Sequence, residues 1–455
     1  MEANSWVKVD LKLFASYFGP ILLTFIGSRF IAQTDIIMLS PLGSDAVGAY
    51  SVPSRVMLLD MIVALALGPV VSVTMAKAKY SEQRCEVING VFSVSIFLGL
   101  SLMLAGLLIY PYIVDNLVSE KNTASLAQEA VFYLTLAIPL RLAQFLGLML
   151  IHGDGRGKVI VPLVLFTIIA NAGLNWLFIY LMEFGFSGCY FATILTTAIE
   201  LAIIILILSD PGKSGSLLCI PKWNWIIEMA RKVGAEWGRL VSYQAVSLVT
   251  LAVFAMNYNR EGQLEVFTLA SELQALLLMP AIAVMRSTAI ILASQQLAQS
   301  LSQIIVSMRD ILTMGFMICF ALAGLLLLTD EDQWRHIYGI SNAALDWWHP
   351  FLVVLALTMP ISLFNSIQRG AWQAIERYNF LFAVDFVVQW LVLLPCVIIG
   401  VYLANPWLTW AGWPLSELIA SLAYVLRRRD LIARHEPSNM IDTPLMAQSS
   451  GVNGE

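Results

Sequence analysis

The chain has 455 residues, of which 59% are hydrophobic and 13% are charged. Its mean hydropathy of +0.77 excludes a soluble globular protein of ordinary composition. The formal net charge of −5 is small for this length, and its basic residues are divided among short segments, so a nucleic-acid partner is not expected. Apolar runs of about 20 residues, the length that crosses a bilayer, recur from one end of the chain to the other. The sequence therefore predicts an all-α polytopic membrane protein with the lipid bilayer as its surroundings.

Twelve transmembrane helices are predicted by reading the apolar runs against the polar breaks. The six expected in the first half cover residues 14–40, 46–76, 87–113, 127–151, 159–182 and 187–208. The six expected in the second half cover residues 235–256, 264–297, 304–328, 344–371, 379–403 and 407–427. Each half thus receives an even number of spans.

A polar stretch at residues 210–233, rich in Pro, Gly, Ser and Lys, lies midway along the chain and predicts a cytoplasmic linker. It separates an N-terminal lobe, residues 1–209, from a C-terminal lobe, residues 234–432. Residues 433–455 are polar and predict a disordered cytoplasmic tail.

The two lobes are expected to be repeats of each other. An offset of 221 residues places Pro139 on Pro360 and Arg156 on Arg377. Two pseudo-symmetric six-helix lobes of the same orientation follow, with the substrate path between them.

Basic residues predict the orientation, because Lys and Arg in short loops are retained in the cytoplasm. Most of the 26 basic residues, including Arg239 and Arg369, are expected on the side of the two termini. Lys121, Arg260 and Arg335 are expected on the other side. The predicted location is the cell inner membrane, with multiple spans and both termini cytoplasmic.

Asp35, late in the first span, is the leading candidate for coupling transport to an ion. A carboxylate in a low-dielectric environment loses the solvation that favours its charged form, so it can bind and release a proton. An alternative is that Asp35 faces the outer headgroups or pairs with an arginine such as Arg29 or Arg55.

Asn171 and Asn175 are four residues apart in the fifth span and therefore share one helical face. This polar stripe either supports a carboxylate, a water or a cation, or joins neighbouring helices by hydrogen bonds. Together with Asp35 and Thr193, the two asparagines form the predicted cation-coupling set.

Further buried polar residues are candidates for lining the substrate cleft, namely Gln33, Arg55, Gln144, Gln244, Glu272 and Arg286. Arginines in such a cleft would favour an anionic solute, although ion pairs with another helix explain them equally well.

Motifs for enzymatic chemistry are not evident. Residues 153–158 resemble a phosphate-binding loop, but the spacing differs and Val159 stands where Ser or Thr is needed. The four histidines are far apart and predict no metal site: His152, His336, His349 and His435. We therefore expect neither an enzyme nor an ATP-driven pump, and no cofactor besides H⁺ or Na⁺ as the coupling ion.

Several motifs resemble those of the multidrug and toxic compound extrusion (MATE) family, over nearly the whole chain. They are Pro20 and Asp35 in the first span, residues 68–71 in the second, Tyr133, Pro139 and residues 153–162 around the fourth, residues 171–175 in the fifth, and Gly188 with Thr193 in the sixth. The resemblance implies a V-shaped cleft between the lobes and antiport of a drug-like solute against protons or sodium. It also implies that protonation of Asp35 is linked to bending of the first helix.

The chain departs from the family pattern at three positions. Gln244 and Thr358 stand where some bacterial members have acids, so a sodium site in the C-terminal lobe is not expected. Asn175 replaces a second aspartate found in some relatives.

The predicted function is proton-driven efflux of a small organic solute or drug by a monomer. The alternatives are a flippase for lipid-linked oligosaccharide and a dedicated exporter of a siderophore or organic acid.

Overall fold

The computed structural model describes residues 11–81, 83–117, 121–209, 222–256, 263–294, 308–330, 333–334 and 342–427. Within these ranges every regular element is a helix. The side chain of Arg55 and the tail predicted at residues 433–455 lie outside the description. The predicted all-α polytopic fold is thus confirmed.

The first group of helices, called the N-lobe below, ends at Leu208. It comprises α1 (Leu11–Leu39), α2 (Ser44–Val56), α3 (Leu58–Ala78), α4 (Gln83–Leu117), α5 (Lys121–Leu136), α6 (Ile138–Asp154), α7 (Gly157–Trp176) and α8 (Gly185–Leu208). A short η1 (Ser40–Leu42) follows α1, and a π-helical turn η2 (Leu177–Leu181) extends α7.

The second group, called the C-lobe below, begins at Trp223. It comprises α9 (Trp223–Met256), α10 (Gln263–Ser294), α12 (Arg309–Leu328), α14 (Asn342–Ala374), α15 (Tyr378–Val388), η3 (Gln389–Leu393), α16 (Leu394–Tyr402) and α17 (Pro406–Leu426). Because α9 starts at Trp223, residues 223–233 are helical rather than part of an extended linker. The domain boundaries otherwise stay a prediction.

Ten described helices or continuous helical runs are long and apolar enough to cross a membrane, or eleven if the bent pair α5–α6 forms one span. The remaining predicted span corresponds to α17, a 21-residue helix. The protein is therefore a multi-pass membrane protein, while the count of twelve stays a prediction.

Two predicted spans are broken in the structure, one of them at a proline. Ile138 and Pro139 open α6, and the missing N–H of a proline cannot complete the preceding helical ladder. The axes of α5 and α6 consequently differ by 57°. The predicted second span is likewise split at Met57, whose amide bonds the carbonyl of Pro53 at 2.9 Å.

The backbone supports the repeat that the sequence predicts. Gly155 and Glu376 both have positive φ values, 75° and 61°, and are 221 residues apart. Glu183 and Ala404 form a second such pair, with φ values of 55° and 54°. Left-handed conformations are uncommon for residues other than glycine, so two coincidences at one offset indicate a shared turn geometry.

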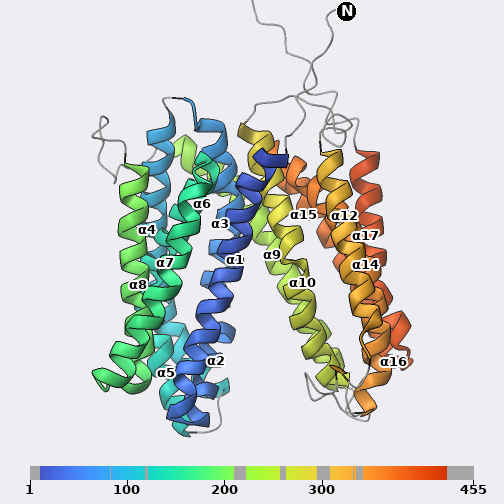
Figure 1. Cartoon of the computed structure of the whole chain (residues 1–455), viewed down its shortest axis with the longest axis horizontal. Coiled ribbons are helices and arrows are strands. Elements are labelled where there is room, and N and C mark those ends of the chain that lie inside the picture. The colour runs from blue at the N-terminus through green and yellow to red at the C-terminus, as the bar shows by residue number, and fades with distance from the viewer. Residues whose placement is uncertain are drawn as a thin grey trace, which may run out of the picture.

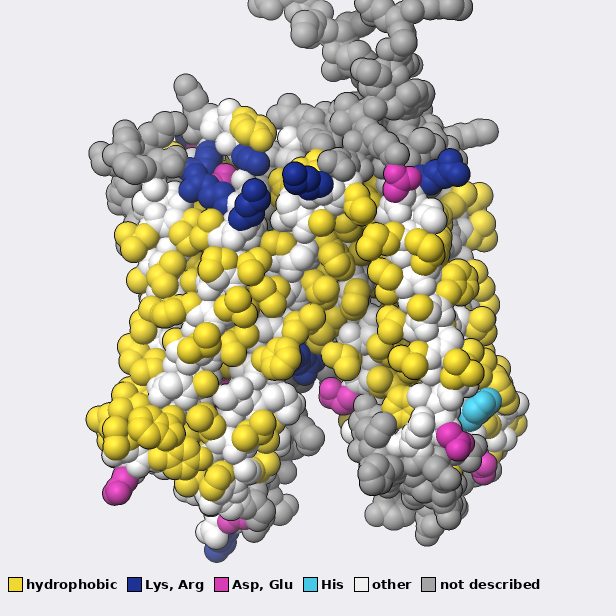
Figure 2. Space-filling view, in the orientation of Figure 1, with side chains coloured by type: hydrophobic (Ala, Val, Ile, Leu, Met, Phe, Trp, Pro, Cys, Tyr) yellow, Lys and Arg dark blue, Asp and Glu magenta, His cyan; other side chains and the backbone are white. Residues whose placement is uncertain are grey.

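The two lobes stand side by side (Figure 1). They are joined near the end where α1 begins, and Figure 2 shows the molecule hollowed between them at the opposite end. An apolar core at the joined end connects Phe14 and Tyr17 of α1 and Val73 of α3 with Ile290 of α10. Lys and Arg side chains gather at this same end on the face that Figure 2 shows.

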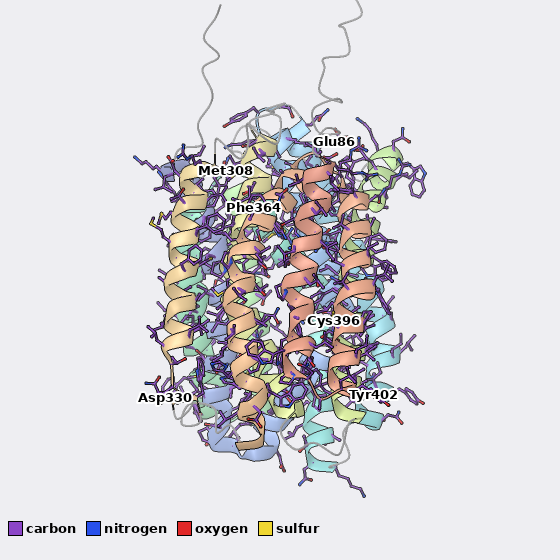
Figure 3. The ribbon with its side chains drawn as sticks, turned by 90° about the vertical axis from the view of Figure 1, so that its right-hand side faces the viewer. Glu86, Met308, Asp330, Phe364, Cys396 and Tyr402 are labelled. Atoms are coloured by element: carbon purple, nitrogen blue, oxygen red, sulfur yellow. The ribbon has the colours of Figure 1, made fainter. Side chains whose placement is uncertain are left out.

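Figure 3 shows the molecule turned so that the C-lobe helices face the viewer. Met308 and Asp330, which flank α12, lie at opposite ends, and Cys396 of α16 lies between those levels. The aromatic core of this lobe, which includes Phe254, Trp348 and Trp410, is buried.

Candidate functional site

Close packing of α1 against α7 positions the candidate site. A Cβ atom added to Gly157, the first residue of α7, would lie 2.7 Å from the carbonyl oxygen of Ser16. One added to Gly27 of α1 would lie 2.5 Å from a methyl carbon of Val164. Because only glycine fits at both contacts, the two backbones approach closely and the later part of α1 is held against α7.

Asp35 is 3% exposed and points into the N-lobe. Its carboxylate accepts a hydrogen bond from Asn175 Nδ2 at 2.6 Å and one from the Tyr50 hydroxyl at 2.9 Å. Asn175 Nδ2 also donates to Asn171 Oδ1 at 3.2 Å. The structure thus brings together three of the four predicted coupling residues, with the Asp35 side chain buried between helices.

The partners of Asp35 carry no positive charge. The Cys189 side chain of α8 lies beside Asp35, and Tyr50 stacks on Tyr190 at a ring distance of 6.4 Å. Within the described residues, no Lys or Arg forms an ion pair with Asp35. Protonation of this carboxylate would therefore leave no buried cation uncompensated.

Thr193, the fourth predicted coupling residue, lies one turn after Cys189 on α8. Its hydroxyl donates to the backbone carbonyl of Cys189 at 3.0 Å rather than to Asp35. Its place beside the site follows from Cys189, whose thiol contacts Asp35. A role for Thr193 in coupling stays a prediction.

The predicted cleft residues are distributed over both lobes. Gln33 and Glu272 are exposed, whereas Gln144, Gln244 and Arg286 are half-buried. In the described part of the chain, no hydrogen bond or ion pair joins any two of them. Their role in binding a solute stays a prediction.

Two arginines expected on the cytoplasmic side, Arg239 and Arg369, lie within helices and are accommodated there by acids. Arg239 of α9 pairs with Glu236 at 2.6 Å and with Asp385 of α15 at 3.1 Å. Arg369 of α14 pairs with Asp385 at 3.4 Å and with Glu417 at 3.2 Å. The physical reason is that buried charges can be accommodated when acids from neighbouring helices surround them.

Arginines within the spans also have acidic neighbours. Arg141 lies 3.9 Å from Asp60, and Arg286 interacts electrostatically with Glu236, while one of its guanidinium nitrogens is buried without a partner in the described residues. Arg29 is exposed. The described arginines therefore do not form a concentrated cationic lining.

The sequence analysis missed Tyr50 and Cys189, the other two side chains that contact Asp35. Tyr50 belongs to α2, which was expected to be the continuous start of the second span. Pro53 lies within α2, and the break between α2 and α3 comes four residues later, at Met57. No cluster of metal-binding side chains occurs in the part of the chain that the structure describes.

Comparison with known proteins connects this geometry to a family. Residues 20–177 match the MatE family model, and no curated protein matches the chain. The N-lobe part of the site that α1 and α7 form lies within this matched segment.

Solved structures extend the similarity to the whole fold. A MATE transporter in the bent conformation covers 93% of this chain and 95% of its own, at 17% identity and a TM-score of 0.79. A MATE transporter of Vibrio cholerae, also in the bent form, covers 93% and 97%, at 13% identity and a TM-score of 0.78. A MOP superfamily transporter of Pyrococcus furiosus covers 93% and 96%, at 16% identity and a TM-score of 0.79.

The resemblance identified from the motifs is confirmed by these findings. The matched segment carries the buried Asp35 and its asparagine neighbours. Residues 20–177 thus match the MatE family model, and the chain as a whole has the fold of solved MATE transporters.

Proposed function

We propose that this protein is a secondary active exporter of a small organic solute, driven by protons that bind to Asp35. The observation that carries the proposal is a carboxylate that is 3% exposed and hydrogen bonded only to uncharged side chains. An ionisable residue within a membrane protein marks a functional site by default, and proton relays are a common use. Export by this fold is consistent with the similarity to MATE transporters.

Coupling follows from the change in hydrogen bonding when Asp35 gains a proton. The charged carboxylate accepts from Tyr50 of α2 and Asn175 of α7, and so holds α1 to both helices. Protonation converts one acceptor oxygen into a donor and weakens these two contacts. The packing of α1 then changes, and the affinity for a solute in the hollow changes with it, as coupling requires.

The two lobes would alternate around the hollow that Figure 2 shows. We place the joined end in the cytoplasm because Lys and Arg gather there. In this orientation the hollow opens outward from the inner membrane, and both termini are cytoplasmic. The coupling ion is H⁺ rather than Na⁺ because Asp35 has two strong hydrogen-bond donors and no second carboxylate beside it.

The experiment compares Asp35→Asn with the wild type in inverted membrane vesicles energised by respiration. Addition of ethidium, a cationic probe, or fluorescein, an anionic one, should dissipate the pH gradient across wild-type vesicles. Asp35→Asn should abolish this response because the amide cannot exchange a proton. Asp115→Asn, an exposed acid on α4, serves as the control. A full response by Asp35→Asn would overturn the proposal.

The flippase and the organic-acid exporter receive no specific support from the described side chains. Both alternatives need an uncompensated cationic surface, whereas Arg141, Arg239 and Arg369 each lie near an acid. The solute is therefore defined here only as a small organic molecule. The contrast between ethidium and fluorescein in the vesicle assay determines its charge class.

A further inference from the structure

We infer that Glu200 of α8 is a second proton-binding residue, connected to Asp35 by uncharged polar side chains between α7 and α8. The inference rests on the proposed proton coupling, but it adds a residue and a route inside the N-lobe. Glu200 belongs to no ion pair within the described residues, and it is 5% exposed. A buried acid with no neighbouring cation is costly to keep permanently charged.

The immediate neighbours of Glu200 are neutral and come from two other helices. Gln144 of α6 and Thr167 of α7 lie beside its side chain. These partners can serve either the acid or the carboxylate, because amides and hydroxyls both donate and accept. Both neighbours can therefore interact with Glu200 whether its carboxyl group is protonated or charged.

The charged and titratable groups on the adjacent helices have other partners. Arg141 of α6 faces Asp60 at 3.9 Å, and the His152 ring approaches Thr24 of α1 at 3.3 Å. Arg156, at the start of α7, pairs with Asp154. Glu129 of α5 accepts a hydrogen bond from Ser187, and the remaining acid that faces α8 is Asp35 itself. None of these groups supplies a counter-charge to Glu200.

A row of polar residues on one face of α7 connects Glu200 with Asp35. Thr167, Asn171 and Asn175 are spaced four residues apart, so they lie on one face of the helix. Thr167 contacts Glu200 at one end, and Asn175 contacts Asp35 at the other. All three polar residues are buried. The face thus connects two acids through side chains that do not themselves ionise.

Helix α8 contributes further polar residues between Asp35 and Glu200. Cys189 contacts Asp35, and Glu200 follows eleven residues later, which corresponds to about 16 Å along an α-helix. Thr193 and Thr196 lie between them, and Thr196 precedes Glu200 by one turn on the same face. A single hydrogen bond cannot span this distance, so transfer requires intermediate groups.

Two buried atoms on the route lack a partner among the described residues. They are Asn175 Oδ1, beside Asp35, and Thr196 Oγ1, one turn from Glu200. Buried polar atoms of this kind are commonly satisfied by internal water, which also carries protons between fixed groups. The two atoms therefore identify places where water would complete the connection.

The proposed transfer is an exchange of one proton between two carboxyl groups. Protonated Asp35 becomes a carboxylate as the Glu200 carboxylate becomes an acid, with no change in total charge. Asp35 lies towards the end of α1 near the open hollow, and Glu200 lies nearer the joined end, because α8 runs back towards it. Glu200 thus provides an exit for the proton on the side opposite to its entry.

The first test measures whether Glu200 titrates. Infrared difference spectra of the purified protein between acidic and alkaline buffer report carboxylic acid groups that gain a proton. Glu200→Gln should remove one such band, and Asp35→Asn should remove a different one. Glu183→Gln, an exposed acid outside the site, should leave both bands unchanged. Unchanged bands in Glu200→Gln would overturn the inference, because Glu200 would then keep one protonation state.

The second test measures transfer in proteoliposomes that contain a pH-sensitive dye. Glu200→Gln should slow the ethidium- or fluorescein-driven proton flux roughly 100-fold, the lower end of what a positioned proton-transferring side chain contributes. Exchange of the same probe without a gradient should be unchanged, and Glu200→Asp should restore part of the flux. A wild-type flux in Glu200→Gln would exclude the relay. If instead Asp35→Asn kept its flux while Glu200→Gln lost it, the proposed role of Asp35 would fail and that of Glu200 would stand.

Discussion

In the N-lobe the buried acids Asp35 and Glu200 contact amide, hydroxyl and thiol groups, whereas in the C-lobe Glu236 and Asp385 contact guanidinium groups. Protonation of Asp385 would remove one of the negative charges that neutralise Arg239 and Arg369. The same change at Asp35 isolates no cation. Asp35 and Glu200 are therefore suited to change charge during transport, whereas Asp385 is suited to stabilise helix packing.

The largest expected effect comes from Asp385→Asn. Removing the charge that Arg239 and Arg369 share should lower the free energy of unfolding by about 3–5 kcal/mol, the usual result of breaking a buried ion pair. Asp35→Asn is the matched change in the other lobe and should have a much smaller effect. Thermal unfolding in detergent measures both. Equal losses in the two variants would show that the lobes do not differ in this respect.

A smaller effect on the unfolding free energy is expected at position 157. The two lobes have different residues at the start of the equivalent helices. Gly157 begins α7, and Tyr378, 221 residues later, begins α15. Gly157→Ala would bring a methyl group within 2.7 Å of the Ser16 carbonyl oxygen. We expect a loss of about 1–3 kcal/mol in unfolding free energy from this overpacking, together with slower probe transport as Asp35 shifts from Asn175.

Gly173→Ala is the control for this prediction because it lies on the same helix and nothing approaches its Cβ position within 4 Å. It should match or exceed the wild-type stability, since alanine favours helix more than glycine does. A similar loss of unfolding free energy in both variants would show that helix propensity, and not the contact between α1 and α7, causes the effect.

The smallest effect concerns Glu376, which links the lobes at their joined end. Its carboxylate pairs with Lys77 of the N-lobe at 2.9 Å and with Lys232 of the C-lobe at 2.7 Å. Glu376→Gln should lower the unfolding free energy by about 1 kcal/mol, as expected for a partly exposed pair. Glu376→Gly should be the more stable variant, because glycine adopts the left-handed φ of 61° without strain. The reverse order would contradict a strained backbone at this position.

The contribution of Glu376 should also depend on pH. Burial disfavours the charged carboxylate, but Lys77 and Lys232 outweigh this and lower the pKa of Glu376 below its ordinary value of 4.5. A lowered folded-state pKa means that the stabilisation is complete above pH 4.5 and is lost as the pH falls through the lowered value. The difference between wild type and Glu376→Gln should therefore disappear only in strong acid. Glu228→Gln, which removes the exposed partner of Lys232, is the control.

Much of the fold could be predicted because lipid imposes one strong rule on the chain. Backbone groups in hydrocarbon must be satisfied within helices, so the positions of long apolar runs indicate the spans directly. Asp35, Asn171 and Asn175 were predictable for a related reason, since polar side chains in such runs are rare and spacing places the asparagines on one face. The repeat was visible in the paired prolines and arginines of the two halves.

Contacts between helices could not be derived in this way, because they depend on how far neighbouring backbones are separated. Tyr50 reaches Asp35 only because α2 breaks from α3 at Met57 and folds beside α1. The same holds for Arg239 and Arg369, because acids from α9, α15 and α17 meet them only in the packed C-lobe. Sequence by itself determined the helical membrane architecture and the rare polar positions, through the demands of hydrocarbon. Tertiary structure alone decided which of those positions meet a charge and which meet a neutral partner.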